Sequence, residues 1–197
     1  ALIAAPLAAQ TTAITGGKVV IGDGSAPIEG GTVLIRNDRV VAAGANVTIP
    51  ADARRIDATG KWVTPGIFAG FSRIGLVEVG AVTQTNDMNA SGSPFSAALD
   101  VQYAINPFAS PVAVNRAAGV TRAVVSPSTS SSIFGGYGAV VDLGQDENPI
   151  TKARAFQFVE LGETGHSRAG GSRSASHIHF RALLNEARTY ARNPAAF

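Results

Sequence analysis

The pattern of apolar and polar positions changes once along this chain, close to Pro65. Before that point, short segments alternate between apolar and polar residues, a period typical of β-strands with one buried face. After it, continuous apolar segments are separated by loops rich in Ser, Pro and Gly, and at least one segment has helical spacing. The chain therefore reads as an all-β part, residues 11–64, followed by a mixed α/β part, residues 65–197.

The all-β part contains several strand-like segments bounded by turn residues. A bulge is expected in the first segment at Gly16-Gly17, and Asn37-Asp38 predicts a two-residue hairpin because both residues tolerate positive φ. These segments predict a small sheet or sandwich. They cover residues 13–21, 31–36, 39–43, 54–58 and 61–64.

The mixed part predicts strands that alternate with helices. A helix over 111–118 has Pro111 near its start and Gly119 at its end. A longer helix begins at a cap supplied by Ser172 or Ser174 and ends near Asn193, before Pro194. Strands are expected at 67–71, 120–125, 135–143 and 156–161, with a helical turn at 99–104.

Composition narrows the classes of function. The chain of 197 residues is 45% hydrophobic and 15% charged, which is too apolar for a disordered protein. Its net charge is +2 and its basic residues are scattered, so nucleic acid is not an expected partner. No run approaches the roughly 20 apolar residues of a membrane span.

The first ten residues have the composition of the end of a secretory signal peptide. They are apolar and rich in small residues, and they close on Leu7-Ala8-Ala9 before Gln10. This interpretation of residues 1–10 places the protein in the periplasm or outside the cell. The alternative is a frayed, Ala-rich terminus.

The segment from Ile56 to Gly66 resembles the entry to the barrel of the amidohydrolase superfamily, metal-dependent hydrolases of C–N and related bonds. Three further matches, Asn86-Asp87, Ile105-Asn106-Pro107 and Gly135-Gly136, are similar to a secreted branch related to imidazolonepropionases. The resemblance implies a partial β-sandwich domain followed by the first half of a (β/α)8 TIM-type barrel. Residues 65–197 supply about half of the ~250 residues of a whole barrel.

The metal motif of that family is absent from its expected place. In the family, Pro-Gly leads into an apolar strand that ends in His-x-His, whose two side chains point to one side and hold one metal. Here the corresponding residues are Phe71-Ser72-Arg73. Phe71 cannot coordinate a metal, and Arg73 carries a permanent positive charge. Near Phe158, metal-bearing relatives have a Lys. We therefore expect no zinc or other divalent metal unless a C-terminal half supplies ligands.

The three histidines of this chain are not placed to replace the missing metal ligands. His177-Ile178-His179 falls in the predicted long helix, where the two rings point roughly 200° apart and cannot share a metal. His166 is predicted to lie in a loop. The Ser-rich segment 126–132 lacks the Gly-x-Ser-x-Gly context of a nucleophile.

Loops that follow barrel strands build active sites, so the loop after the first barrel strand provides the candidates for substrate contact. They are Arg73, Glu78, Asn86 and Asp87. Arg73 is either an anion-binding replacement or an ion-pairing surface residue. Asp100 and Glu160 are further acids near strand ends. No catalytic residue can be assigned.

Two functions remain open. One is a hydrolase of C–N bonds with a small-molecule substrate. The other is a non-catalytic homologue that acts as a binding or partner subunit, in a homo-oligomer or in a hetero-oligomer with an active amidohydrolase. A half barrel exposes strand edges and an apolar inner face, which favours such partners.

Overall fold

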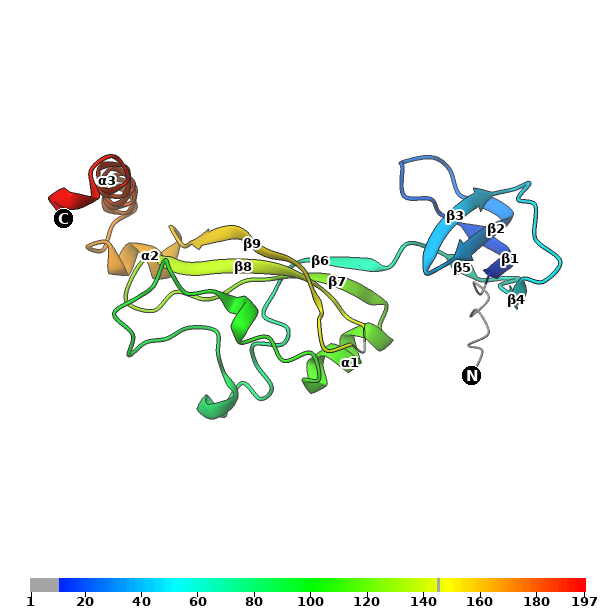
Figure 1. Cartoon of the computed structure of the whole chain (residues 1–197), viewed down its shortest axis with the longest axis horizontal. Helices are drawn as coiled ribbons and strands as arrows, with labels where there is room; N and C mark the ends of the chain where they lie inside the picture. Colours follow the sequence, from blue (N-terminus) through cyan, green and yellow to red (C-terminus); the bar gives the residue numbers. More distant parts are fainter. Residues whose placement is uncertain (1–10, 145) are drawn as a thin grey trace, which may run out of the picture. The chain divides into compact units, whose positions relative to one another are not determined.

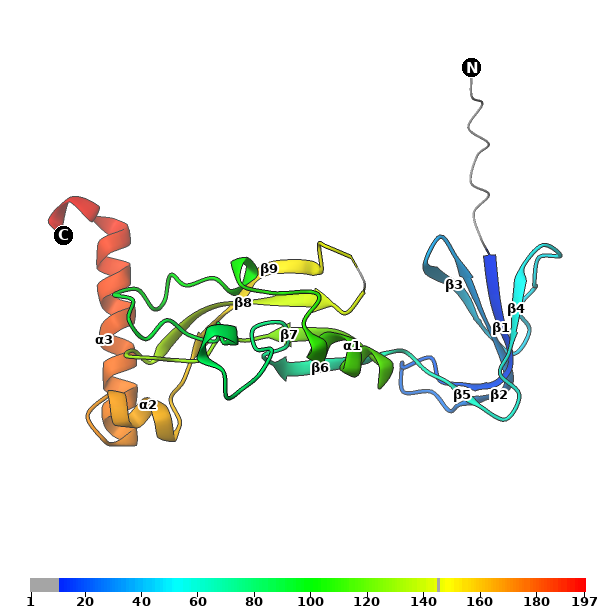
Figure 2. The same cartoon turned by 90° about the horizontal axis from the view of Figure 1, so that it is seen from below.

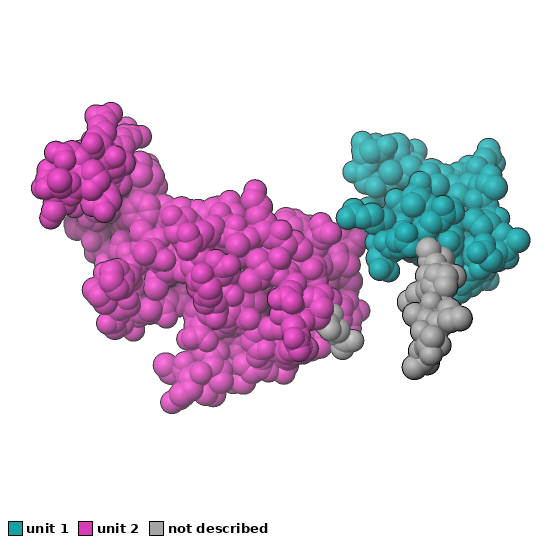
Figure 3. All heavy atoms as spheres, in the orientation of Figure 1, with its two compact units in different colours: residues 1–65 teal, residues 66–197 magenta. Residues whose placement is uncertain are grey.

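The computed structural model describes residues 11–144 and 146–197, so the predicted signal segment 1–10 lies outside the described residues. The chain divides into two compact units, residues 1–65 and residues 66–197 (Figure 3). Each unit contains one sheet, and the fold is mixed α/β (Figure 1).

The first unit is a five-stranded sheet in the order β3-β2-β1-β4, with β5 also paired to β1. Strand β1 is antiparallel to β2 and parallel to β4 and β5, and β2 is antiparallel to β3 (Figure 2). The described residues of this unit form one sheet, and the sandwich stays a prediction. The strands are β1 (Thr11–Val19), β2 (Ile28–Arg36), β3 (Arg39–Gly44), β4 (Arg54–Asp57) and β5 (Trp62–Val63).

Two local predictions in this unit are confirmed. Asn37 and Asp38 join β2 to β3 with φ values of 50° and 58°, as a primed two-residue hairpin requires. The pairing of β1 with β2 shifts register at Thr15/Gly17, where Gly16 has a φ of 76°. The expected bulge at the glycine pair is therefore present.

The second unit contains a four-stranded sheet in the order β6-β7-β8-β9. Strands β6 and β7 are parallel, and the helix α1 lies between them in sequence, as predicted. Pro111 lies in the first turn of α1 and Gly119 follows its end with a φ of 95°. The elements are β6 (Ile67–Ser72), η1 (Thr83–Thr85), η2 (Val101–Tyr103), α1 (Ser110–Ala117), β7 (Val120–Val125), β8 (Phe134–Asp142) and β9 (Ile150–Val159).

The remaining strand pairs depart from the expected parallel barrel. Both β7–β8 and β8–β9 are antiparallel, and no closed barrel forms among residues 11–144 and 146–197. The connections explain the difference, because the loops 126–133 and 143–149 suit hairpins. A parallel partner needs a crossover of a dozen or more residues.

Only one face of this sheet carries the core. Ala123, Val125, Ala139 and Val141 of β7 and β8 are buried there. Residues from the segment between β6 and β7 cover them, and Figure 1 shows α1 and the neighbouring loops on one side of the strands. Strand alternation places other residues on the opposite side, which we call the open face. They are Phe68, Val124, Val140, Phe156 and Phe158.

Three elements follow β9: α2 (Glu163–Arg168), α3 (Arg173–Arg192) and η3 (Pro194–Ala196). The Ser172 hydroxyl caps α3 by accepting a hydrogen bond from Ala175 N at 3.1 Å, which decides between the two predicted caps. Helix α2 was not predicted, so the placement of His166 in a loop was wrong. Among the described residues, no helix has the length and apolarity to cross a membrane.

Candidate functional site

Phe71 and Arg73 lie at the carboxyl end of β6. The Ser72 hydroxyl between them donates to Val124 O at 2.8 Å, which fixes this strand end against β7. The Phe71 ring lies beside the Phe158 ring, with centroids 6.2 Å apart and planes inclined by 40°. The guanidinium carbon of Arg73 lies 5.6 Å from the centroid of the Phe71 ring. We call these three residues the aromatic–Arg cluster.

Glycines in β8 make room for the aromatic rings of β9. A methyl group added at Gly135 would lie 2.9 Å from Cδ1 of Phe158. At Gly138, the paired partner of Phe156, an added methyl group would overlap the Phe156 ring. The glycine-rich start of β8 therefore serves packing between strands.

The aromatic–Arg cluster does not fit a hydrolytic metal. A catalytic zinc takes three protein ligands with N, O or S donors, and the two rings of the cluster supply none. Arg73 adds a fixed positive charge beside the Phe71 ring, and this charge repels a cation. Within residues 11–144 and 146–197, no group of three or more His, Cys, Asp or Glu side chains could hold a metal ion.

The structure brings Glu78, Asn86 and Asp87 together in a folded-back loop. Glu78 N donates to Thr85 O at 3.1 Å, and Asp87 N donates to Leu76 O at 2.8 Å. Glu78 and Asp87 line one pocket of ≈ 470 Å³. Arg73 lines a different pocket of ≈ 340 Å³, to which Glu78 also contributes. The four substrate-loop candidates therefore do not converge on one cavity.

Glu78 is engaged with the start of α1. Its carboxylate accepts hydrogen bonds from the Ser110 hydroxyl and from Ser110 N, the latter at 3.0 and 3.1 Å. The hydrogen bond from the Ser110 hydroxyl, and to a smaller extent the bond from Ser110 N, hold the pKa of Glu78 below its usual value. Glu78 thus ties the loop to the α1 N-terminus, where a negative charge is stabilised by the helix dipole.

Asp100 forms a polar cluster that sequence reasoning did not find. Its side chain is 4% exposed, and Oδ2 accepts from Arg154 Nε at 2.6 Å and from Gln102 Nε2 at 2.7 Å. Burial raises the pKa of Asp100, but the hydrogen bonds from Arg154 and Gln102 outweigh burial and leave the pKa below its usual value. Arg154 also stacks over the Tyr137 ring at 5.2 Å.

Glu160 and the Ser/Thr-rich loop belong to another structural contact. The Thr129 hydroxyl donates to Glu160 Oε2 at 2.8 Å and accepts from Arg168 Nη1. Thr129 and Ser126 are both buried. These contacts tie the loop after β7 to α2, which gives the loop a structural role.

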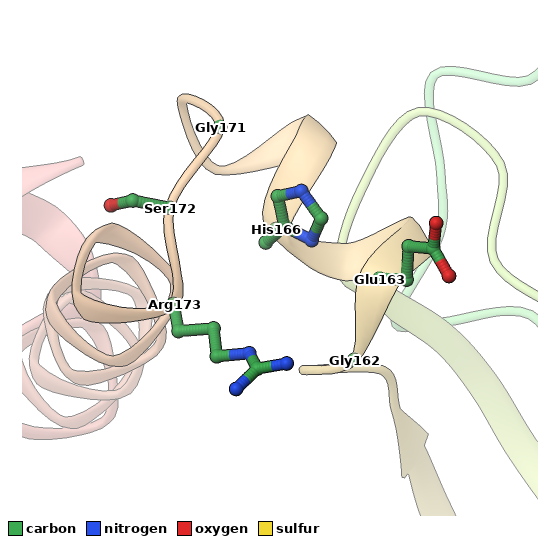
Figure 4. A pocket seen from close by; sticks show the side chains of 6 residues that line it. All are labelled: Gly162, Glu163, His166, Gly171, Ser172 and Arg173. Atoms are coloured by element: carbon green, nitrogen blue, oxygen red, sulfur yellow. The ribbon is translucent and has the colours of Figure 1, made fainter.

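A pocket of ≈ 370 Å³ lies beside His166, between α2 and the start of α3 (Figure 4). The guanidinium of Arg173 extends toward Gly162. The carboxylate of Glu163 points away from Arg173. His177 and His179 lie within α3, as predicted. Helical geometry sets their side chains on different sides of the helix, so the pair does not form a metal site.

No protein-family model and no curated protein matches this chain. A crystal structure of an amidohydrolase from Thermotoga maritima is similar to it, with a TM-score of 0.77 and 26% identity. The match covers 94% of this chain and 49% of that chain, so this chain spans about half the length of the Thermotoga protein. Its two small sheets thus match half of an amidohydrolase chain.

Two other solved structures match shorter stretches. A molinate hydrolase is 33% identical over 36% of this chain and 15% of its own, with a TM-score of 0.31. A prolidase complexed with N-methylphosphonate-L-proline is 24% identical over 36% of this chain and 17% of its own, with a TM-score of 0.32. Both matches are too local to bear on the fold. The resemblance to the amidohydrolase superfamily is supported by the Thermotoga structure, while the imidazolonepropionase-related branch stays a prediction.

Proposed function

We propose that this chain is an amidohydrolase-superfamily protein whose first metal site has been replaced, and that it acts as a non-catalytic binding or partner subunit of an active relative. In this proposal its first unit is a partial β-sandwich, and its second unit is the first half of a (β/α)8 barrel of the imidazolonepropionase-related branch. The contact between Phe71 and Phe158 carries the proposal.

By resemblance, the family places a metal-binding His at Phe71 and a Lys near Phe158, far apart in sequence. The two rings lie 6.2 Å apart, so the fold brings these two positions together. The side chains at both positions are apolar, which supports a retained frame with altered chemistry. Hydrolysis in the family manner needs a metal that lowers the pKa of a bound water.

A second candidate is a hydrolase of C–N bonds acting on a small-molecule amide. The similarity to the Thermotoga amidohydrolase favours it. In this case a complementary C-terminal half would hold zinc or another divalent metal. Arg73, Glu78, Asn86 and Asp87 would then contact substrate from the loop after β6.

Metal analysis after exhaustive dialysis tests the first candidate. The unmodified chain should retain no stoichiometric zinc. The double variant Phe71→His, Arg73→His should gain affinity for zinc. Glu78→Gln combined with Asp87→Asn is the matched control, because these loop carboxylates line a pocket and have oxygen donors that could bind a hard cation. Stoichiometric zinc in the unmodified chain that is lost in this control would overturn the proposal.

We also propose export to the periplasm or the cell exterior, from the composition of residues 1–10. The mature protein should begin at about Gln10, which N-terminal sequencing of the exported protein would measure. A mature protein that begins at Ala1 would contradict this assignment.

A further inference from the structure

The pocket of ≈ 370 Å³ beside His166 is built by one short stretch of chain, residues 162–173. Helix α2 ends at Arg168, and the chain then turns through Gly170 and Gly171, whose φ values are 93° and 85°. Gly171 N donates to His166 O at 2.7 Å, which closes the turn over the end of α2. The turn therefore brings the start of α3 back beside His166.

Two basic side chains border this pocket from different elements. His166 extends from α2 and is half-buried, and Arg173 is the first residue of α3 and is exposed (Figure 4). The guanidinium carries its N–H groups in one rigid plane, and the imidazole supplies a further N–H donor at neutral pH. Hydrogen-bond donors from two helices therefore line one cavity.

Among the described residues, no acidic side chain pairs with these two groups, since neither His166 nor Arg173 forms an ion pair. Glu163 lines the same pocket, but Figure 4 shows its carboxylate pointing away from Arg173. The wider segment is also basic, because residues 162–192 contain five arginines and two glutamates. The pocket therefore has an uncompensated positive charge, which favours an anionic ligand.

The first turn of α3 is already capped from within the chain. Ser172 Oγ accepts a hydrogen bond from Ala175 N at 3.1 Å, so this hydroxyl is engaged with the helix itself. The side chains of His166 and Arg173, rather than the helix end, are the groups left to hold a ligand in this pocket.

We propose that this pocket binds a small tetrahedral oxyanion, a phosphate or sulfate group that is free or attached to a small molecule, between the Arg173 guanidinium and the His166 imidazole. The oxygens of such an anion point to several sides, so they accept hydrogen bonds from donors on two helices at once. A planar carboxylate is matched by the guanidinium alone. The volume of ≈ 370 Å³ also leaves room for a small attached group. The inference goes beyond the proposed function and does not depend on the aromatic–Arg cluster.

Amide NMR titrations of the full 197-residue chain test the proposal, with inorganic phosphate, sulfate and acetate added separately at constant ionic strength. Phosphate and sulfate should shift the amide signals of Gly162 and Gly171, and each should bind at least about fivefold more tightly than acetate. A parallel titration with glycerol phosphate separates two sources of the same chemistry. Tighter binding than that of inorganic phosphate assigns an organic phosphate, and weaker binding assigns the free anion.

Single substitutions locate the site. Arg173→Gln should weaken phosphate binding at least about tenfold, because it removes the charged donor, and Arg173→Lys should recover part of the loss. His166→Ala should weaken binding about threefold through the loss of one hydrogen bond. Glu163→Gln should tighten binding about twofold, because a negative charge beside the pocket is removed.

Arg181→Gln is the matched control, since Arg181 is an exposed arginine of α3 that does not line the pocket. It should change the affinity for phosphate less than about twofold. Four results would overturn the proposal. They are no shift of the pocket amides with phosphate, binding that Arg173→Gln leaves unchanged, equal losses in Arg173→Gln and Arg181→Gln, and acetate binding as tight as that of phosphate. Equal losses would indicate a diffuse attraction to α3, and tight acetate binding would assign the pocket to carboxylates.

Discussion

At the scale of single residues, the Asp100 carboxylate shows how a buried charge is held. Gln102 N donates to Oδ1 at 3.2 Å, and Oδ2 accepts from Gln102 Nε2 and Arg154 Nε. Arg154 adopts a φ of 45°, which is uncommon for a residue with a side chain. The contact between Arg154 and Asp100 therefore accompanies an unusual backbone conformation.

Replacing Asp100 by Asn should lower the free energy of unfolding by about 2 kcal/mol. The substitution removes a charged hydrogen-bond acceptor and leaves Arg154 without its ionic partner, and bonds to charged groups contribute roughly 1.5–3 kcal/mol. Urea unfolding measures the change. Asp87→Asn, at an exposed carboxylate, is the matched control and should change the free energy by less than about 0.5 kcal/mol. Equal effects in the two variants would contradict the role of the Asp100 cluster.

The same pair predicts a pH dependence. The pKa of Asp100 is lower in the folded chain than its ordinary value of 3.8, so the unfolded chain binds the proton first as pH falls. The stability difference between the natural chain and Asp100→Asn should be full above pH 3.8. It should shrink as pH falls toward the folded pKa. A difference that grows on acidification would contradict this assignment.

Residue identity alone pointed to Phe71 and Arg73, because their place after Pro65-Gly66 could be read from the sequence. The contact of Phe71 with Phe158 and that of Asp100 with Arg154 could not be derived in the same way. Each pair is far apart in the chain, 54 residues for Asp100 and Arg154, and its two residues belong to segments that do not pair with each other as strands. Sequence spacing predicts contacts within one element, and these contacts join different elements.

At the scale of elements, the sequence predicted the features that depend on residues close together in the chain, such as turns and helix ends. The Asn37-Asp38 hairpin and the order β6, α1, β7 follow from turn chemistry and from helix-end signals. The start of β9 was missed, because Thr151 to Arg154 is exposed and three of its four residues are polar. Helix α2 was missed because it has only six residues and its Gly162 cap carries no side chain.

Position 136 in β8 has no room for a side chain larger than that of glycine. Gly136 has a φ of 112°, and a methyl group there would lie 2.5 Å from Leu99 O. Gly136→Ala should destabilise the chain by about 2–4 kcal/mol, from backbone strain and overpacking together. Gly70→Ala in β6 is the control, because nothing lies within 4 Å of the added methyl group. Thermal unfolding measures both, and equal melting temperatures would contradict the geometry at Gly136.

The Ser172 cap predicts a local effect on α3. Ser172→Ala removes the acceptor for Ala175 N and should weaken the first turn by about 1 kcal/mol. Amide hydrogen exchange in that turn should then be about fivefold faster. Ser174→Ala is the matched control, since the Ser174 hydroxyl contacts the Ser172 hydroxyl and caps no backbone group among the described residues. Faster exchange in Ser174→Ala alone would reassign the cap.

At the scale of the whole molecule, the chain resembles half of an amidohydrolase chain, and we propose that its side chains differ from the family's at the first metal positions. The resemblance is supported by similarity over 94% of this chain. The antiparallel pairing of β8 and β9 was not predicted, because the family resemblance implied parallel barrel strands, although the short loops before β8 and β9 favour hairpins. Their Phe156 and Phe158 rings extend the open face beyond β6 and β7.

The coupling between Phe71 and Phe158 tests this account most directly. A double-mutant cycle with Phe71→Ala, Phe158→Ala and the double variant, followed by urea unfolding, isolates the energy of the ring contact. Rings at 6.2 Å should be coupled by about 0.5–1.5 kcal/mol. Additive effects, with no coupling beyond measurement error, would mean that the rings do not meet and would contradict the contact on which the proposed replacement of the metal site rests.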